Sequence, residues 1–90
     1  MVKNYKIVMA KDVEKEKEKI KQFSSLVDNV NDIIRILEEN PFKNPPRYEK
    51  LVGNFKGLYS RRINKKHRLV YSVFEKEKIV KIISMWTHYE

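Results

Sequence analysis

The fold is decided by residues 58–74, which read Leu58-Tyr59-Ser60-Arg61-Arg62-Ile63, Asn64-Lys65-Lys66 and His67-Arg68-Leu69-Val70-Tyr71-Ser72-Val73-Phe74. The first and third parts are rich in β-branched and aromatic residues, which favour strands, and the polar middle part has the composition of a turn. Another run of the same kind, residues 78–86, follows the turn segment 75–77. Together these segments predict an antiparallel meander of three to four strands.

Upstream of this segment the sequence predicts one strand and two helices. Residues 5–9 are rich in Val, Ile and Tyr and are interpreted as a strand. Residues 12–23 contain no Gly or Pro, and the alternating Glu and Lys of residues 14–19 are expected to form a solvated helix face. The second helix is predicted from apolar residues at helical spacing, which are Leu26, Val30, Ile33, Ile34 and Leu37.

This order of elements predicts an α+β fold with both helices packed on one face of the sheet. Pro41 ends the second helix, because proline removes a backbone donor, and residues 41–46 are expected to form an extended connector. A chain of 90 residues supports one small core. We therefore expect residues 1–90 to form a single domain.

The composition argues against several classes of protein. The chain has no cysteine, and no apolar segment resembles a signal peptide or a membrane span. Two histidines without a thiolate do not suggest a zinc site, and two glycines do not make a phosphate-binding loop. We expect a cytoplasmic protein that needs no metal or other cofactor and does not bind membranes.

Positive charge is concentrated in the second half of the chain. Residues 1–45 hold 9 Lys and Arg against 8 Asp and Glu, whereas residues 46–90 hold 11 against 4. A positive field on one part of a small domain attracts polyanions, and nucleic acid is the leading candidate. A basic surface that serves solubility explains the charge alone equally well.

The candidate catalytic groups lie within this basic half. Glu49 is the single acid between Arg47 and Arg68, where it is a candidate general base or one half of an ordinary surface ion pair. Arg61 and Arg62 leave opposite faces of a strand, so they cannot both serve one catalytic site. An antiparallel turn would bring Arg68 beside Arg62, as a phosphate site or as a basic edge that discourages aggregation.

The last five residues are Trp86-Thr87-His88-Tyr89-Glu90. Three rings within four residues indicate either a packed terminus or a surface on which the bases of single-stranded RNA stack. Histidine exchanges protons near neutral pH, which makes His88 a candidate general acid.

Several of these motifs together resemble the YoeB/Txe toxins of type II toxin-antitoxin systems, in the RelE/ParE superfamily. They are Ser60-Arg61-Arg62-Ile63, His67-Arg68-Leu69-Val70-Tyr71, His88-Tyr89 and the Pro41-Phe42 pair. The resemblance covers residues 41–90 and implies a RelE-like fold. It also implies a metal-independent endoribonuclease that enters the ribosomal A site and cleaves mRNA, by attack of a ribose 2′-OH on the adjacent phosphate.

The resemblance also implies roles for individual residues. Glu49, assigned by its spacing to the Ser-Arg-Arg motif, is the implied general base, Arg68 the main phosphate contact and His88 the general acid. Tyr89 would orient the nucleotide, and Arg62 would support the phosphate. The remaining RNA contacts that we expect are Arg61, Lys50, Lys65, Lys66 and Trp86.

A toxin that stops translation must be restrained, so the resemblance and the basic half imply a cognate antitoxin of the YefM/Axe type with an acidic, partly disordered segment. The expected target is the ribosome (the 30S A site and its rRNA) with its mRNA, and a homodimer is left open. Two other functions also stay open. One is a non-enzymatic ParE-like toxin that inhibits gyrase, and the other is an RNA-binding module that leaves its RNA intact.

Overall fold

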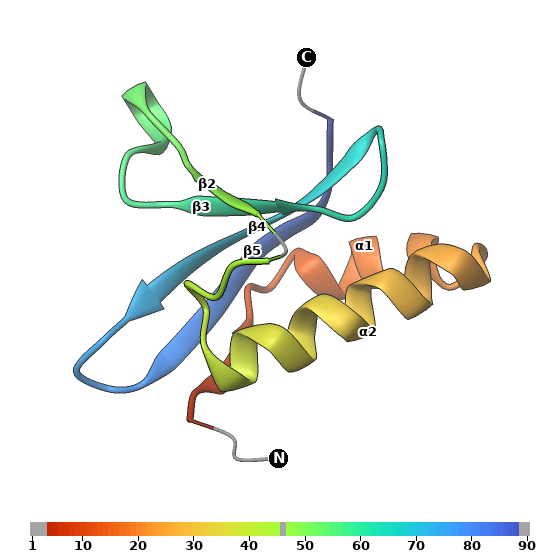
Figure 1. Ribbon diagram of the computed structural model, residues 1–90. Coiled ribbons are helices and arrows are strands. Elements are labelled where there is room, and N and C mark those ends of the chain that lie inside the picture. The colour runs from red at the N-terminus through yellow and green to blue at the C-terminus, as the bar shows by residue number, and fades with distance from the viewer. Residues whose placement is uncertain (1–3, 46, 89–90) are drawn as a thin grey trace.

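The computed structural model describes residues 4–45 and 47–88. In this part of the chain two helices pack on one face of a five-stranded sheet with the strand order β1-β5-β4-β3-β2 (Figure 1). The predicted α+β fold with an antiparallel meander is confirmed, the meander having four strands. In chain order the elements are β1 (Lys6–Met9), α1 (Val13–Ile20), α2 (Ser24–Glu39), β2 (Tyr48–Lys50), the short 3-10 helix η1 (Gly53–Phe55), β3 (Tyr59–Arg62), β4 (His67–Phe74) and β5 (Ile79–His88).

The two edge strands of the sheet are β1 and β2. At one edge β1 lies parallel to β5, with Ile7 opposite Val80. At the other edge β2 pairs antiparallel with β3, with Glu49 opposite Ser60. The sequence did not predict β2 as a strand, because three residues are too few to display an alternating pattern.

The core lies between the helices and the inner face of the sheet. Neither helix has a side-chain hydrogen bond at its N-cap, so both depend mainly on packing. Burying a large apolar side chain contributes about 1.5–3 kcal/mol, which makes the predicted stripe of α2 the main anchor of that helix. The buried cluster from α2, β4 and β5 comprises Leu26, Val30, Ile33, Leu37, Leu69, Tyr71, Val80, Ile82 and Met85.

The first helix differs from its prediction at two points. It ends at Ile20, because the chain turns there and lets α2 pack back on the same face of the sheet, and Phe23 stays 49% exposed. Glu16 is not part of a solvated face. Its carboxylate accepts hydrogen bonds from the Ser84 hydroxyl (2.9 Å) and the Met85 N–H (3.2 Å), beside the bulged part of the β4–β5 pairing.

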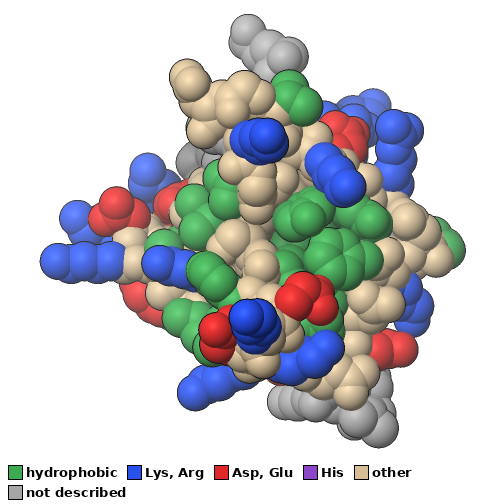
Figure 2. All heavy atoms as spheres, turned by 90° about the vertical axis from the view of Figure 1, so that its left-hand side faces the viewer, with side chains coloured by type: hydrophobic (Ala, Val, Ile, Leu, Met, Phe, Trp, Pro, Cys, Tyr) green, Lys and Arg blue, Asp and Glu red, His purple; other side chains and the backbone are tan. Residues whose placement is uncertain are grey.

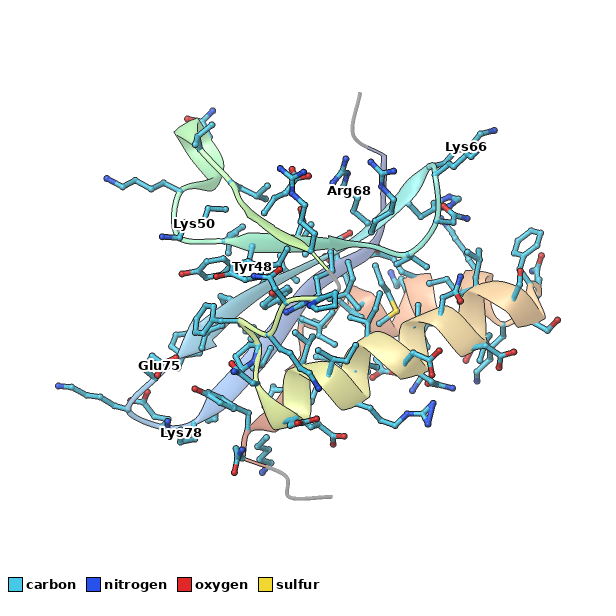
Figure 3. The ribbon with its side chains drawn as sticks, in the orientation of Figure 1. Tyr48, Lys50, Lys66, Arg68, Glu75 and Lys78 are labelled. Carbon is cyan, nitrogen blue, oxygen red and sulfur yellow. The ribbon has the colours of Figure 1, made fainter. Side chains whose placement is uncertain are left out.

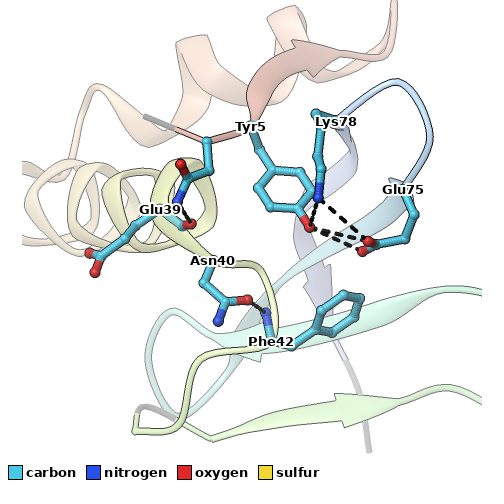
Figure 4. Close-up of polar contacts among 7 residues, drawn as sticks. Tyr5, Glu39, Asn40, Phe42, Glu75 and Lys78 are labelled. Atoms are coloured by element: carbon cyan, nitrogen blue, oxygen red, sulfur yellow. Dashed lines mark hydrogen bonds and ion pairs between the residues drawn. The ribbon is translucent and has the colours of Figure 1, made fainter. Parts of the chain in front are cut away.

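Polar contacts join the β4–β5 turn to the residues that precede β1 (Figure 4). The Tyr5 hydroxyl donates to the Glu75 carboxylate at 3.1 Å and accepts from the Lys78 ammonium at 3.5 Å. After α2, the side-chain oxygen of Asn40 accepts the N–H of Phe42 at 2.9 Å. Within the residues described, neither helix has the length and apolar character needed to cross a membrane.

Candidate active site

An open cavity lies on the face of the sheet that turns away from the helices. Its volume is about 310 Å³, and strands β3 and β4 contribute to it together with the chain around β2. Figure 3 shows the Arg68 side chain on this side of the sheet, pointing away from α1 and α2. The lining residues are Arg47, Glu49, Ser60, Arg62 and Arg68.

The strand register explains why these side chains converge. Antiparallel partners point to the same face, and side chains alternate along each strand. Glu49 lies opposite Ser60, and Arg62 lies opposite Arg68, as the sequence predicted for the two arginines. Because Ser60 and Arg62 are two residues apart on β3, all four side chains share one face.

Glu49 and Arg68 form an ion pair that reaches across β3. The Oε1–Nη1 distance is 3.5 Å, and the side chains are 45% and 20% exposed. A pair as exposed as this contributes about 0–1 kcal/mol to stability, so its importance is chemical. A carboxylate that can take up a proton and a guanidinium that can hold phosphate oxygens lie within reach of one substrate group.

Arg61 points to the opposite face and is 1% exposed, so the prediction that it contacts RNA is wrong. Its guanidinium donates to the backbone oxygens of Pro41 and Lys43, each at 2.9 Å, and to the Tyr71 hydroxyl at 3.3 Å. It also lies over the Tyr48 ring, 5.3 Å from the centroid. Arg61 therefore fastens the connector that leads into β2.

Tyr71 shares the task of holding the connector. Its hydroxyl donates to the Pro41 carbonyl at 2.8 Å, and its ring stacks on Tyr59 with centroids 5.7 Å apart. Burial raises the pKa of the Tyr71 phenol above its ordinary value of 10.0, although the neighbouring Arg61 guanidinium acts in the opposite direction. The phenol therefore remains a neutral donor at physiological pH.

The predicted lysine contacts lie outside the cavity. Lys50 leaves β2 on the face opposite Glu49 and lines a second cavity, of about 380 Å³, beside the β2–β3 loop. Figure 2 shows the side of the molecule that lies on the left in Figure 1. Hydrophobic side chains gather in the middle of this face, with Lys and Arg around them. Lys65 and Lys66 are exposed in the β3–β4 turn. RNA contacts of these three lysines stay predictions.

The predicted residues near the end of the chain are described only in part. The backbone of β5 reaches His88, and Thr87 lies opposite Arg68, so this backbone runs beside the start of β4. The side chains of Trp86 and His88, and the whole of Tyr89, lie outside the described part of the chain. Their roles in stacking, acid catalysis and nucleotide orientation stay predictions.

Two residues of the cavity, Arg47 and Ser60, were not predicted as site residues. The signal for both was the alternation of strand side chains, since Arg47 precedes Glu49 by two residues and Ser60 precedes Arg62 by two. Within the described ranges, no three His, Cys, Asp or Glu side chains lie close enough together to hold a metal ion.

Comparison with known proteins identifies the family. Residues 10–89 match the YoeB-like toxins of bacterial type II toxin-antitoxin systems. Toxin YoeB of a Synechocystis species is 37% identical over 65 residues, which are 72% of this chain and 73% of that toxin.

Solved structures agree with the sequence match. A YoeB/ParE toxin from Agrobacterium tumefaciens superimposes with a TM-score of 0.84 and 30% identity, covering 93% of this chain and 99% of that one. The YoeB-YefM complex from Staphylococcus aureus gives a TM-score of 0.80 and 31% identity, over 94% and 98%. The chain, with its helix-backed sheet and its carboxylate–arginine cavity, belongs to the family of YoeB-like toxins of bacterial type II toxin-antitoxin systems.

Proposed function

We propose that this toxin is a ribosome-dependent endoribonuclease that cleaves mRNA in the A site and so inhibits translation. The observation that supports the proposal most directly is the ion pair of Glu49 with Arg68 in an open cavity whose other charged groups are arginines. The A-site target and the cyclic product come from the resemblance to YoeB/Txe toxins.

In the proposed reaction the phosphate on the 3′ side of the attacking ribose binds Arg68, with Arg62 and Arg47 completing a cationic site. The Glu49 carboxylate takes the proton of the 2′-OH, and the 2′-oxygen attacks phosphorus. Charge that grows on the phosphate oxygens is stabilised by the guanidinium groups, whose planar forks match two oxygens at once.

The leaving step needs an acid. As the bond from phosphorus to the 5′-oxygen breaks, His88 is proposed to give its proton to that oxygen, which leaves a 2′,3′-cyclic phosphate on the upstream fragment. Tyr89 is proposed to orient the nucleotide and Trp86 to stack on a base. None of these steps draws on a metal ion or another cofactor.

Primer extension on a defined mRNA in a purified ribosomal system tests the proposal. The wild-type toxin should give stops within the A-site codon only when ribosomes are present. Arg68→Ala should lower the cleavage rate about 10²- to 10³-fold, and Glu49→Gln or His88→Ala about 10²- to 10⁴-fold. Lys17→Ala, on the outer side of α1, serves as the matched loss of one positive charge and should cleave normally.

Two controls separate loss of chemistry from loss of fold. Each variant should keep the melting temperature of the wild type within a few degrees, and Arg68→Lys, which keeps the charge without the fork, should remain strongly impaired. Intact mRNA in the wild-type lane would overturn the nuclease proposal, and inhibition of gyrase supercoiling by the same preparation would support a ParE-like activity instead.

We also propose that a YefM/Axe-like antitoxin binds and silences this chain in the cytoplasm, where the ribosomes are. The Staphylococcus aureus relative assembles with YefM, and the basic second half of this chain suits an acidic segment. The antitoxin from the same operon should copurify with the toxin and block cleavage. Full activity in the presence of excess antitoxin would contradict this pairing. A toxin homodimer is a further proposal, tested by light scattering.

A further inference from the structure

The Ser60 hydroxyl is buried without a hydrogen-bond partner. Among the residues that the structure describes, its Oγ is a buried side-chain atom for which no donor or acceptor lies within reach, and the residue is 1% exposed. Leaving a buried hydroxyl unpaired costs free energy, so native proteins seldom keep one without a functional reason. Alanine would fill nearly the same space without that cost.

Ser60 also lies at the centre of the proposed site. It lines the cavity, between Glu49 on β2 and Val70 on β4, which are its partners on either side. The ion pair between Glu49 and Arg68 joins β2 to β4 and must therefore cross β3 on the face from which Ser60 projects. The ion pair and the Ser60 hydroxyl therefore share one face of the sheet.

We propose that Ser60 binds the substrate phosphate. When a phosphate takes the place of Glu49 at Arg68, the ion pair across β3 opens, and the Ser60 hydroxyl donates a hydrogen bond to a phosphate oxygen. The phosphate then has a neutral donor beneath it in addition to the surrounding guanidinium groups. This inference rests on the proposed function and adds Ser60 to the binding site.

The chemistry of the three groups favours this ligand. A phosphate offers several acceptor oxygens, while the neighbouring arginines are donors that cannot satisfy the hydroxyl proton. The exchange of carboxylate for phosphate at Arg68 also leaves Glu49 free to accept the proton of the 2′-OH. Substrate binding thus breaks the ion pair between Glu49 and Arg68 and, in the same step, frees the Glu49 carboxylate to act as the base.

Ser60→Ala separates this role from a structural one. The variant should melt at the same temperature as the wild type or up to about 5 °C higher, because it removes an unpaired buried group. Its rate of ribosome-dependent cleavage should fall about 10- to 100-fold, the loss expected for one hydrogen bond to a charged group. Ser72→Ala, on β4 and outside the cavity, should change neither quantity.

A ribosome-free measurement keeps the inference distinct from the proposed function. Binding of adenosine 3′-monophosphate, followed by NMR, should weaken about tenfold or more in Ser60→Ala. Normal cleavage by this variant beside an active wild type, or unchanged binding of the nucleotide, would overturn the role of Ser60 and leave the nuclease proposal intact. Weaker nucleotide binding with no cleavage by the wild type would overturn the nuclease proposal alone.

The pH dependence decides between phosphate and Glu49 as the partner of the hydroxyl. If the hydroxyl donates to phosphate, Ser60→Ala lowers the plateau of the pH–rate profile and leaves its acid limb in place. A displaced acid limb with an unchanged plateau would show that Ser60 supports the Glu49 carboxylate, and it would overturn the assignment to phosphate.

Discussion

At the scale of single residues, Arg61 and Arg62 show how two adjacent, chemically identical side chains come to lie in different environments. Arg62 is exposed at the cavity, whereas Arg61 is buried among carbonyl and phenol oxygens. A buried cation is stable only when its donors are satisfied, and the connector carbonyls satisfy them here. The residues that hold the connector are thus drawn from the same motif as those that line the site.

The buried phenol of Tyr71 predicts a pH dependence of stability. Its pKa is raised in the folded protein, chiefly by burial, so the folded state favours the neutral form. The stability that this group contributes is fully present below pH 10, where the unfolded chain also keeps it protonated, and is lost as the pH rises through the folded pKa.

Urea unfolding at pH 9, 10 and 11 measures this effect. The wild type should lose stability faster above pH 10 than Tyr71→Phe, at a rate approaching about 1.4 kcal/mol per pH unit for this one group. Other tyrosines and lysines titrate in both proteins and cancel in the comparison. Parallel declines would contradict the assignment. Tyr71→Phe should be less stable at pH 9, because the Pro41 carbonyl loses one donor.

At the scale of elements, α1 fixes the shape of β5 through Glu16. The β4–β5 pairing changes register between Arg68 and Tyr71, and the Glu16 carboxylate receives two hydrogen bonds from the adjacent part of β5. Bulges re-aim a strand, and this one precedes the part of β5 that leads to His88. The helix that carries Glu16 therefore holds the strand in its irregular course.

Replacing Glu16 should destabilise the protein in proportion to the bonds lost. Glu16→Ala should cost about 1–3 kcal/mol, and Glu16→Gln should cost less because its amide oxygen can still accept. Glu18→Ala, which removes an exposed pair with Lys21 from the same helix, should change stability by less than about 1 kcal/mol. Chemical unfolding measures the stability of all three variants. Equal losses of stability in Glu16→Ala and Glu18→Ala would contradict a stabilising contact between Glu16 and β5.

At the scale of the whole molecule, the charge gathered in the second half predicts a salt-dependent affinity for RNA. Each phosphate neutralised on a single strand contributes about −0.7 to the slope of log K against log salt concentration. Lys65→Ala or Lys66→Ala should make the slope shallower by about this amount. Lys17→Ala, with the same net charge change, should leave it unaltered. An equal decrease of the slope in all three variants, measured with a short RNA, would show that general charge and not local contact binds RNA.

The local patterns predicted much of the molecule. The stripe from Leu26 to Leu37 predicted α2, because a buried helix face repeats every 3.6 residues, and residues 67–74 predicted β4 through their composition. The opposite orientations of Arg61 and Arg62, and the pairing of Arg62 with Arg68, followed from strand alternation and a short turn. Period and turn length are local properties, so both could be predicted before the fold was known.

Three features could be seen only in the folded chain. They are the burial of Arg61 in place of Arg62, the pairing of β2, and the ion pair of Glu49 with Arg68 across β3. The same holds for the parallel pairing of β1 with β5 and for the contact of Glu16 with β5. Each of these features joins segments that are distant in the chain. Their free energy depends on how the connector, the helices and the sheet pack together, and no window of neighbouring residues contains that information.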